Sequence, residues 1–135
     1  MKKKYIVIPV LILALGLFVG CGSKRLPDGF DENQIKSVAN DFIDKINGGN
    51  YEECYNQFGT IMKESMTEEK LTSTFTPILE SLGEFKQIKK HSLSSANSLG
   101  VDYAVSTVTC EYANGNATYT ISIDKDLKIG GLYIK

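Results

Sequence analysis

Apolar residues in the first half of the chain recur every three or four positions, a spacing that places side chains on one face of a helix. The stripe expected for a first helix consists of Ile35, Val38, Ala39, Phe42, Ile43 and Ile46. Asp31 precedes this stripe and is predicted to cap the helix, and Gly48-Gly49 is predicted to end it. The folded part of the chain therefore begins with an amphipathic helix.

Two further helices are expected after the first. Asn50, with Glu53 three residues later, has the form of a capping box at the start of a short helix. Thr67 is predicted to cap a longer helix that ends at Gly83. Pro77 lies inside that helix and predicts either a kink or a restart. The first half is thus a three-helix segment.

The second half of the chain is typical of β-strands. Residues 85–91 and 101–135 are rich in Tyr, Val, Thr and Ile, and turn residues lie between the strands. Asn114-Gly115 is the signal of a two-residue hairpin of the primed type, which pairs Ala113 with Asn116. That register opposes Tyr112 to Ala117, Cys110 to Tyr119, Val108 to Ile121 and Ser106 to Ile123 on one face.

A second hairpin is predicted where Asp124 pairs with Lys128. Continuing this register turns Tyr133 towards the apolar face and turns Leu132 and Ile134 to the outer face. Three helices followed by four antiparallel strands with one apolar face predict an α+β fold, in which the helices pack on that face.

Three stretches of the chain together resemble a known family: GGNYEECYNQF, LGEFK and YANGNATYTISIDKDLKIGGLYIK. They are similar to the bacterial domain of unknown function 3887 family over residues 32–135. The resemblance implies three N-terminal helices packed on a curved four-stranded antiparallel sheet, the cone-like fold of nuclear transport factor 2 relatives, with a pocket at its open end. It implies no reaction, because this fold carries enzymes and binding modules alike. Leu127 stands where the family usually has glycine, and a left-handed turn would strain it.

The N-terminus has the pattern of an export signal. Lys2, Lys3 and Lys4 precede an apolar run that is too short for an ordinary membrane-spanning helix. Phe18-Val19-Gly20-Cys21 resembles the lipobox of bacterial lipoproteins, which implies cleavage before Cys21 and fatty acyl chains attached to it. The alternative is an uncleaved anchor helix. The predicted divisions are a signal peptide (1–20), a lipidated cysteine with a flexible tether (21–31) and a domain (32–135) on the extracytoplasmic side of the cell membrane.

Charge and composition narrow the classes of partner. Removing residues 1–20 takes away three lysines and leaves 115 residues with a formal net charge of −4. An acidic domain without a basic stripe does not suit nucleic acid, so the expected partners are the membrane, through the lipid on Cys21, and a ligand or protein. His91 is the only histidine and has no neighbours at metal-ligand spacing. We therefore expect no metal and no cofactor, and place His91 at a solvated strand end.

Tyrosines are the candidate ligand-binding residues. Six aromatic residues are predicted to converge where the second helix meets the sheet, namely Tyr51, Tyr55, Phe58, Tyr112, Tyr119 and Tyr133. The ligand-binding candidates among them are Tyr55, Tyr112, Tyr119 and Tyr133, whose hydroxyls need water or a ligand as partners. The alternative is a tyrosine-rich core whose hydroxyls reach its rim.

Two cysteines remain after lipidation of Cys21. Cys54 and Cys110 both face the predicted core. They form either a disulfide, which an exported domain permits, or a pair of buried free thiols. The bond requires Cα atoms within about 7 Å of each other, which the sequence does not fix.

The outer face of the sheet is predicted to expose Tyr103, Val105, Leu132 and Ile134. Exposed apolar side chains on a flat sheet favour a contact surface, for a weak homodimer or for an envelope protein. The leading hypothesis is a membrane-anchored, non-enzymatic binding or interaction domain. Two alternatives stay open, a small hydrolase or isomerase that uses Tyr and Asp in a pocket, and a structural envelope component that dimerises.

We predict that Cys21→Ser abolishes membrane attachment, because serine lacks the thiolate that takes up the lipid. Cell fractionation should find the variant in the soluble fraction, or as an uncleaved precursor, whereas the wild type stays with the membranes. A variant that fractionates like the wild type, with the same mature mass, would rule out the lipid anchor.

Overall fold

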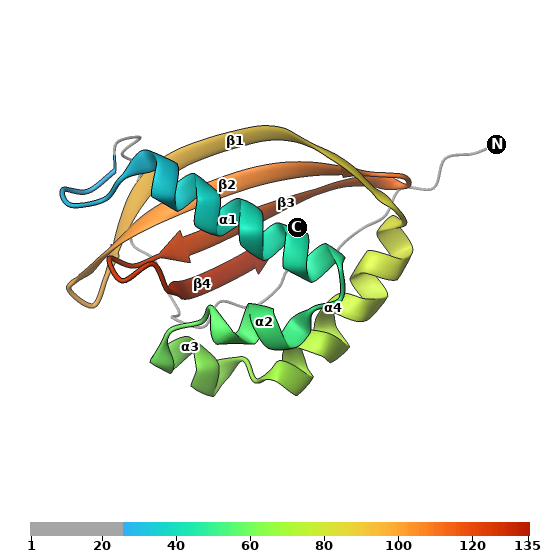
Figure 1. Ribbon diagram of the computed structural model, residues 1–135, viewed down its shortest axis with the longest axis horizontal. Coiled ribbons are helices and arrows are strands. Elements are labelled where there is room, and N and C mark those ends of the chain that lie inside the picture. The colour runs from blue at the N-terminus through green and yellow to red at the C-terminus, as the bar shows by residue number, and fades with distance from the viewer. Residues whose placement is uncertain (1–25) are drawn as a thin grey trace.

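The computed structural model describes residues 26–135, so the predicted signal peptide, Cys21 and the first part of the tether lie outside the described residues. The helices are α1 (Glu32–Asn47), α2 (Tyr51–Asn56), α3 (Thr60–Ser65) and α4 (Glu68–Leu82). The strands are β1 (Phe85–Ser98), β2 (Val101–Tyr112), β3 (Gly115–Ile123) and β4 (Ile129–Ile134), and they form one antiparallel sheet in the order β1-β2-β3-β4. The predicted α+β fold is confirmed, with one more short helix than expected (Figure 1).

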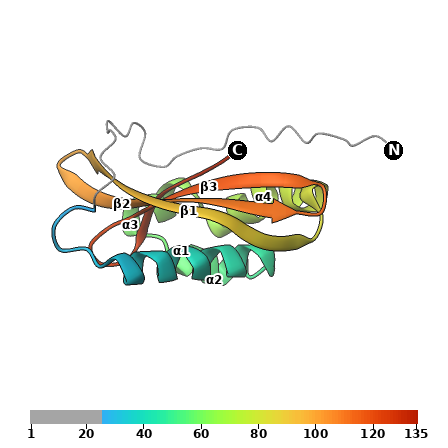
Figure 2. The ribbon, with the colours of Figure 1, turned by 90° about the horizontal axis from the view of Figure 1, so that it is seen from above.

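The helices cover one face of the sheet. α1 lies across that face, and the other three helices gather on the β4 side, as Figure 1 and Figure 2 show from two directions. The largest fully buried side chains between the layers include Phe42, Phe58, Phe75, Tyr119, Ile121 and Ile123. Burying a side chain of this size contributes about 1.5–3 kcal/mol, so this layer is the main source of stability. No helix within residues 26–135 is long and apolar enough to span a bilayer.

The predicted starts and ends of the two long helices are confirmed. The Asp31 side chain accepts a hydrogen bond from the backbone N–H of Gln34 at 3.0 Å, and Thr67 does the same for Lys70 at 3.2 Å. Gly83 ends α4 with a φ of 81°, a conformation that strains any residue with a Cβ. These local signals were readable because each depends on residues within a single turn.

The structure differs from the helix predictions in three places. The Asn50 side chain makes no capping hydrogen bond, although α2 begins where expected. α4 continues through Pro77 as one helix instead of restarting there. The sequence pattern missed α3, which has six residues and buries only Met62, too few for a periodic stripe.

β1 is longer than the predicted strand, which ended at residue 91. It continues to Ser98, and its second half pairs with the whole first half of β2. The residues from Ser92 onward are mostly serines and carry little strand propensity of their own. Pairing with an apolar neighbouring strand therefore extends β1, which is a tertiary effect.

The register of β2 and β3 differs by two residues from the prediction. Tyr112 pairs with Gly115, so the two loop residues are Ala113 and Asn114. Because the shift is even, every side chain keeps its predicted face. The cause lies at the end of α4. The N–H of Ala113 donates to the carbonyl of Glu84, just beyond the helix, at 2.7 Å, and the N–H of Asn114 donates to the carbonyl of Leu82, the last helical residue, at 2.8 Å.

The predicted orientation of three residues of β4 is wrong. Ile123 pairs with Ile129, but Ser122 pairs with Gly131, so an extra residue, Gly130, interrupts the ladder. That single insertion exchanges the inner and outer faces of β4 relative to the prediction. Leu132 and Ile134 are therefore buried, at 1% and 0% exposure, and Tyr133 lies on the outer face. The Tyr103 ring explains why residue 130 is a glycine, because a Cβ at that position would lie 2.7 Å from Tyr103 Cε1.

Leu127 and Leu99 adopt left-handed backbone conformations, with φ of 64° and 53°. For a residue with a side chain this costs roughly 1–2 kcal/mol. At Leu127 two interactions offset part of that cost. The side chain packs against the core, and the Asp124 carboxylate accepts hydrogen bonds from the backbone N–H groups of Asp126 and Lys128. Leu99 has no such compensation, because its side chain is 89% exposed.

We predict that Gly130→Ala lowers the free energy of unfolding by about 1–3 kcal/mol, because the new methyl group collides with the Tyr103 ring. Chemical denaturation measures this change. In a Tyr103→Ala background the same substitution should cost much less, since the colliding ring is gone. Equal costs in both backgrounds would show that the close approach does not require the glycine.

Candidate functional site

A cavity of about 560 Å³ opens at the end of the molecule where α1 and α4 stop and β1 begins. Its walls combine apolar, aromatic, hydroxyl, amide and carboxylate groups, from Ile46, Asn47, Tyr51, Thr76, Leu79, Glu80, Glu84 and Phe85, together with three glycines. The three glycines are the residues at which α1 and α4 end: Gly48, Gly49 and Gly83. Because they have no side chains, they also leave open the space that forms the cavity. Most small-molecule sites share this mixture of apolar surface and a few polar groups.

A chain of hydrogen bonds leads from this cavity into the core. Asn47 lines the cavity, and its Oδ1 accepts a hydrogen bond of 2.8 Å from the Tyr112 hydroxyl. The Tyr112 and Tyr119 hydroxyls are 2.7 Å apart. Tyr119 is fully buried and stacks on Phe75 with ring centroids 6.4 Å apart. Two buried phenols are thus satisfied by one amide at the cavity wall.

Burial sets the protonation of these phenols. Loss of solvation raises the pKa of Tyr112 to about 12 and raises the pKa of Tyr119 well above its ordinary value. Both hydroxyls are therefore neutral at physiological pH and act as hydrogen-bonding groups, not as bases. Asn47 Nδ2 is buried and has no hydrogen-bond partner among the described residues.

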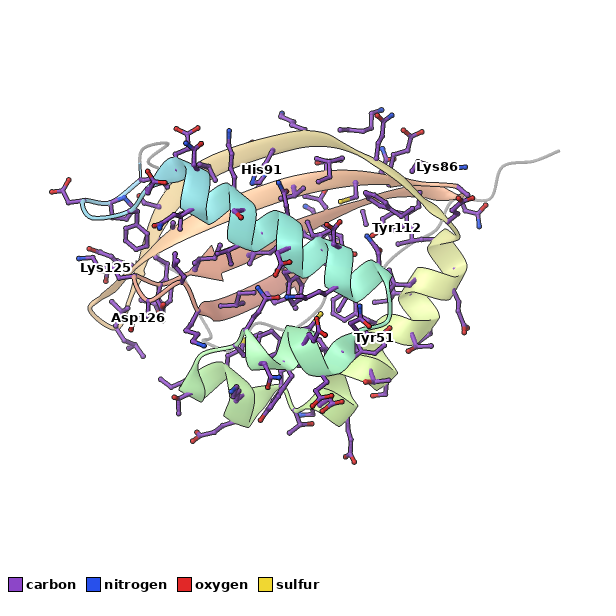
Figure 3. All side chains as sticks on the ribbon, viewed as in Figure 1. Tyr51, Lys86, His91, Tyr112, Lys125 and Asp126 are labelled. Atoms are coloured by element: carbon purple, nitrogen blue, oxygen red, sulfur yellow. The ribbon has the colours of Figure 1, made fainter. Side chains whose placement is uncertain are left out.

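The rim of the cavity is polar and acidic. The Tyr51 hydroxyl lies 3.3 Å from the Thr76 hydroxyl, which joins α2 to α4 across the opening. Glu80 and Glu84 add two exposed carboxylates, and the Lys86 ammonium lies 3.5 Å from Glu84. Figure 3 shows Tyr51, Tyr112 and Lys86 together at this end of the molecule.

Comparison with known proteins places the chain in a family. Residues 39–132 match the family described as protein of unknown function (DUF3887). The chain belongs to the DUF3887 family. It is also similar to a protein from Ruminococcus gnavus ATCC 29149 solved by NMR, with 28% identity and a TM-score of 0.70, over 81% of this chain and 95% of that one. No curated protein matches the sequence.

Of the four tyrosines predicted to bind a ligand, the DUF3887 domain brings two together. Tyr112 and Tyr119 share the buried hydrogen bond described above. Tyr55 lies elsewhere, with its ring edge against Phe58 and the Lys63 ammonium 5.2 Å from the ring centroid. Tyr133 lies on the outer face of the sheet because of the extra residue in β4. The predicted tyrosine cluster is therefore wrong as a four-residue site.

The predicted partner surface on the outer sheet face is also wrong as composed. Leu132 and Ile134 belong to the core. Tyr103 and Val105 keep their predicted face but are 7% and 9% exposed, and the Tyr103 ring covers Gly130. A flat exposed apolar surface formed by these four residues does not exist.

The described cysteines are both free, buried thiols, so the structure has the second of the two arrangements that the sequence left open. Cys54 Sγ lies 3.9 Å from the carbonyl oxygen of Phe42. Burial raises the pKa of Cys54 and of Cys110 to about 12 in each case. Neither thiol is a nucleophile near neutral pH, and both act as small core side chains.

His91 lies at a position that the sequence placed in solvent. It pairs with Val108 on the inner face of the sheet, and its Nε2 is 3.1 Å from the Ser106 hydroxyl. Burial, together with the nearby Lys36 ammonium, lowers the pKa of His91 below its ordinary value. Within residues 26–135, no group of three or more His, Cys, Asp or Glu side chains is placed to hold a metal ion.

The sequence reasoning missed the residues that line the cavity, chiefly Asn47, Thr76 and Glu80. It treated Gly48-Gly49 and Gly83 only as helix stops. The available signal was topological, because the first and last helices run towards the same end of the molecule (Figure 1) and so bring both stops together there. Residues next to such stops are therefore candidates for lining a pocket.

We predict that the domain loses stability above about pH 9. Cys54, Cys110, Tyr112 and Tyr119 all have raised pKa values in the folded state, so the unfolded chain releases protons first as the pH rises. The free energy of unfolding should be constant with respect to these groups below pH 9 and should fall as the pH approaches 12. Urea denaturation across this range measures the slope.

Tyr112→Phe is the matched variant for this measurement. It removes one of the titrating groups, so its stability should fall less steeply with pH than that of the wild type, whatever its stability at neutral pH. An identical slope in both proteins would contradict the assignment.

Proposed function

We propose that this protein is a lipid-anchored binding protein of the bacterial cell surface, and that its DUF3887 domain holds a small ligand in the end cavity. The cavity at the stops of α1 and α4 is the observation that carries the binding proposal. The lipobox-like segment at Cys21 carries the anchoring proposal, and it is independent of the cavity.

Charge indicates the class of ligand. α1 and α4 both direct their C-terminal ends, which carry partial negative charge, towards the cavity. Glu80 and Glu84 add full negative charges at the rim, and Lys86 offsets them only partly because this exposed pair is screened by solvent. The site therefore favours a ligand with an apolar body and a basic or donor-rich group.

The arrangement of polar groups favours binding over catalysis. The Tyr112 phenol, which is bonded to Asn47 behind the cavity wall, is neutral, and the described thiols are buried and protonated. A proton-transfer catalyst needs a group whose pKa lies near the working pH. By contrast, the buried Asn47 N–H has no partner among the described residues, which costs on the order of 1–3 kcal/mol, and a ligand acceptor that reaches it once the side chain rotates would recover part of that energy.

The test is ligand capture by the full mature protein. We expect the protein, purified from its host membranes and incubated with an envelope extract, to carry a basic small molecule that native mass spectrometry detects as added mass. Glu80→Trp places a large ring over the cavity and should abolish that added mass. Circular dichroism shows whether the variant keeps its fold.

Glu64→Trp is the matched control, because Glu64 is also an exposed helical glutamate but lies on α3, outside the cavity wall. It should retain the ligand. If the wild type gains no mass, or if Glu80→Trp keeps the ligand as well as Glu64→Trp does, the cavity is not a binding site.

A further inference from the structure

The turn between β1 and β2 exposes apolar side chains at the tip of a hairpin. Ser98 pairs with Val101, so the two loop residues are Leu99 and Gly100. The Leu99 side chain is 89% exposed and that of Val101 is 44% exposed. In the described part of the chain, the other large hydrophobic residue of this kind, Ile61, lies on α3. A leucine at a protruding tip has no role in the fold that the structure shows.

The backbone makes this leucine more unusual. Both loop residues have positive φ, 53° for Leu99 and 81° for Gly100, and such positions favour Gly, Asn or Asp. Leu127 is also left-handed, but it packs against the core. Leu99 is therefore unfavourable in both its backbone conformation and its exposure, and a residue that is costly without structural compensation points to a function.

The tip lies at the end of the domain where the chain enters from its N-terminus. Leu26 packs against the core, and Gly29 lies beside the turn between β3 and β4, where a Cβ on it would be 3.2 Å from Lys125 Cε. Figure 1 and Figure 2 show this N-terminal segment and the β1–β2 turn at the same end. Ala104 pairs with Ile123, so the hairpin extends three residues, about 10 Å, beyond its last pair with β3.

Chain length fixes how far this end can lie from the anchor. Cys21 and Leu26 are five residues apart, and a fully extended chain covers at most about 18 Å over that distance. A lipid on Cys21 therefore holds Leu26, and with it the tip end of the domain, close to the bilayer surface. The cavity lies at the opposite end of α1 from this N-terminal segment.

We propose that the Leu99–Val101 tip inserts into the interfacial region of the bilayer as a second membrane contact beside the lipid. The inference rests on the proposed lipid anchor at Cys21. The tip contributes apolar surface that gains by leaving water, and the anchor supplies the proximity that two side chains alone do not provide. This contact fixes the orientation of the domain, with its cavity directed outward.

The test measures the depth of the tip in a membrane. Leu99→Cys and Val101→Cys are labelled with a nitrobenzoxadiazole fluorophore in the full lipidated protein, which is reconstituted in vesicles of phosphatidylcholine and phosphatidylglycerol. Cys54 and Cys110 do not compete for the label, since both are buried and their pKa values are raised to about 12. Phosphatidylcholine with a nitroxide on its acyl chain should quench both tip labels.

Lys86→Cys is the control, because Lys86 is exposed at the opposite end of the domain (Figure 3). Its label should lose no fluorescence in the same vesicles. Leu99→Asn in the Val101→Cys background removes the apolar side chain and suits the left-handed turn. It should lose most of the quenching at residue 101.

Each remaining outcome overturns the proposal in a recognisable way. Unquenched tip labels on a protein whose mass includes the lipid reject the tip contact and leave the anchor standing. Equal quenching at residues 99 and 86 shows that the domain has no fixed orientation. Tip labels that are shielded from iodide but not quenched by nitroxide lipid indicate a second copy or another protein on the tip. A mass without lipid rejects the anchor and the tip contact together.

Discussion

The hydrogen bonds between the end of α4 and the β2–β3 turn are the constraint on which the rest of the structure depends. Ala113 and Asn114 donate their backbone N–H groups to Glu84 and Leu82, so the turn is fixed to the helix end. The Asn114 side chain adds a third bond, to the carbonyl of Ser81 at 3.1 Å. This attachment sets the strand register, and the register brings Tyr112 within reach of the last residue of α1. The cavity exists because both helices stop at the level of this turn.

The sequence predicted features that depend on neighbouring residues and missed those that depend on distant ones. The caps at Asp31 and Thr67 could be read locally, and so could the alternation that gives β2 and β3 their faces. The register of the first hairpin could not, because helix carbonyls about thirty residues earlier compete for the turn N–H groups. The reversed faces of β4 likewise depend on Tyr103, a residue two strands away from Gly130.

The candidate site shows the same limit. Tyr112 and Tyr119 were identifiable as inward-facing tyrosines, since an even shift of register leaves the faces unchanged. Their actual partner is Asn47, at the end of a helix more than sixty residues earlier, and no periodic pattern marks that amide. Tyr133 could not be excluded from the site without knowing of the extra residue in β4. Pockets of this kind form from helix ends, and these are the least patterned positions of a sequence.

The two ends of the domain differ in a physically consistent way. At the cavity end, polar groups are buried with nearly complete hydrogen bonding, and the cost of placing phenols in the core is offset by the Tyr119–Tyr112–Asn47 chain. At the other end, the apolar side chain of Leu99 is exposed, and its backbone conformation adds strain. Selection for stability alone removes a cost of the second kind, because Asn or Gly fits the turn better. In the proposed membrane contact the same exposed side chain leaves water, so the cost would be specific to the protein without its bilayer.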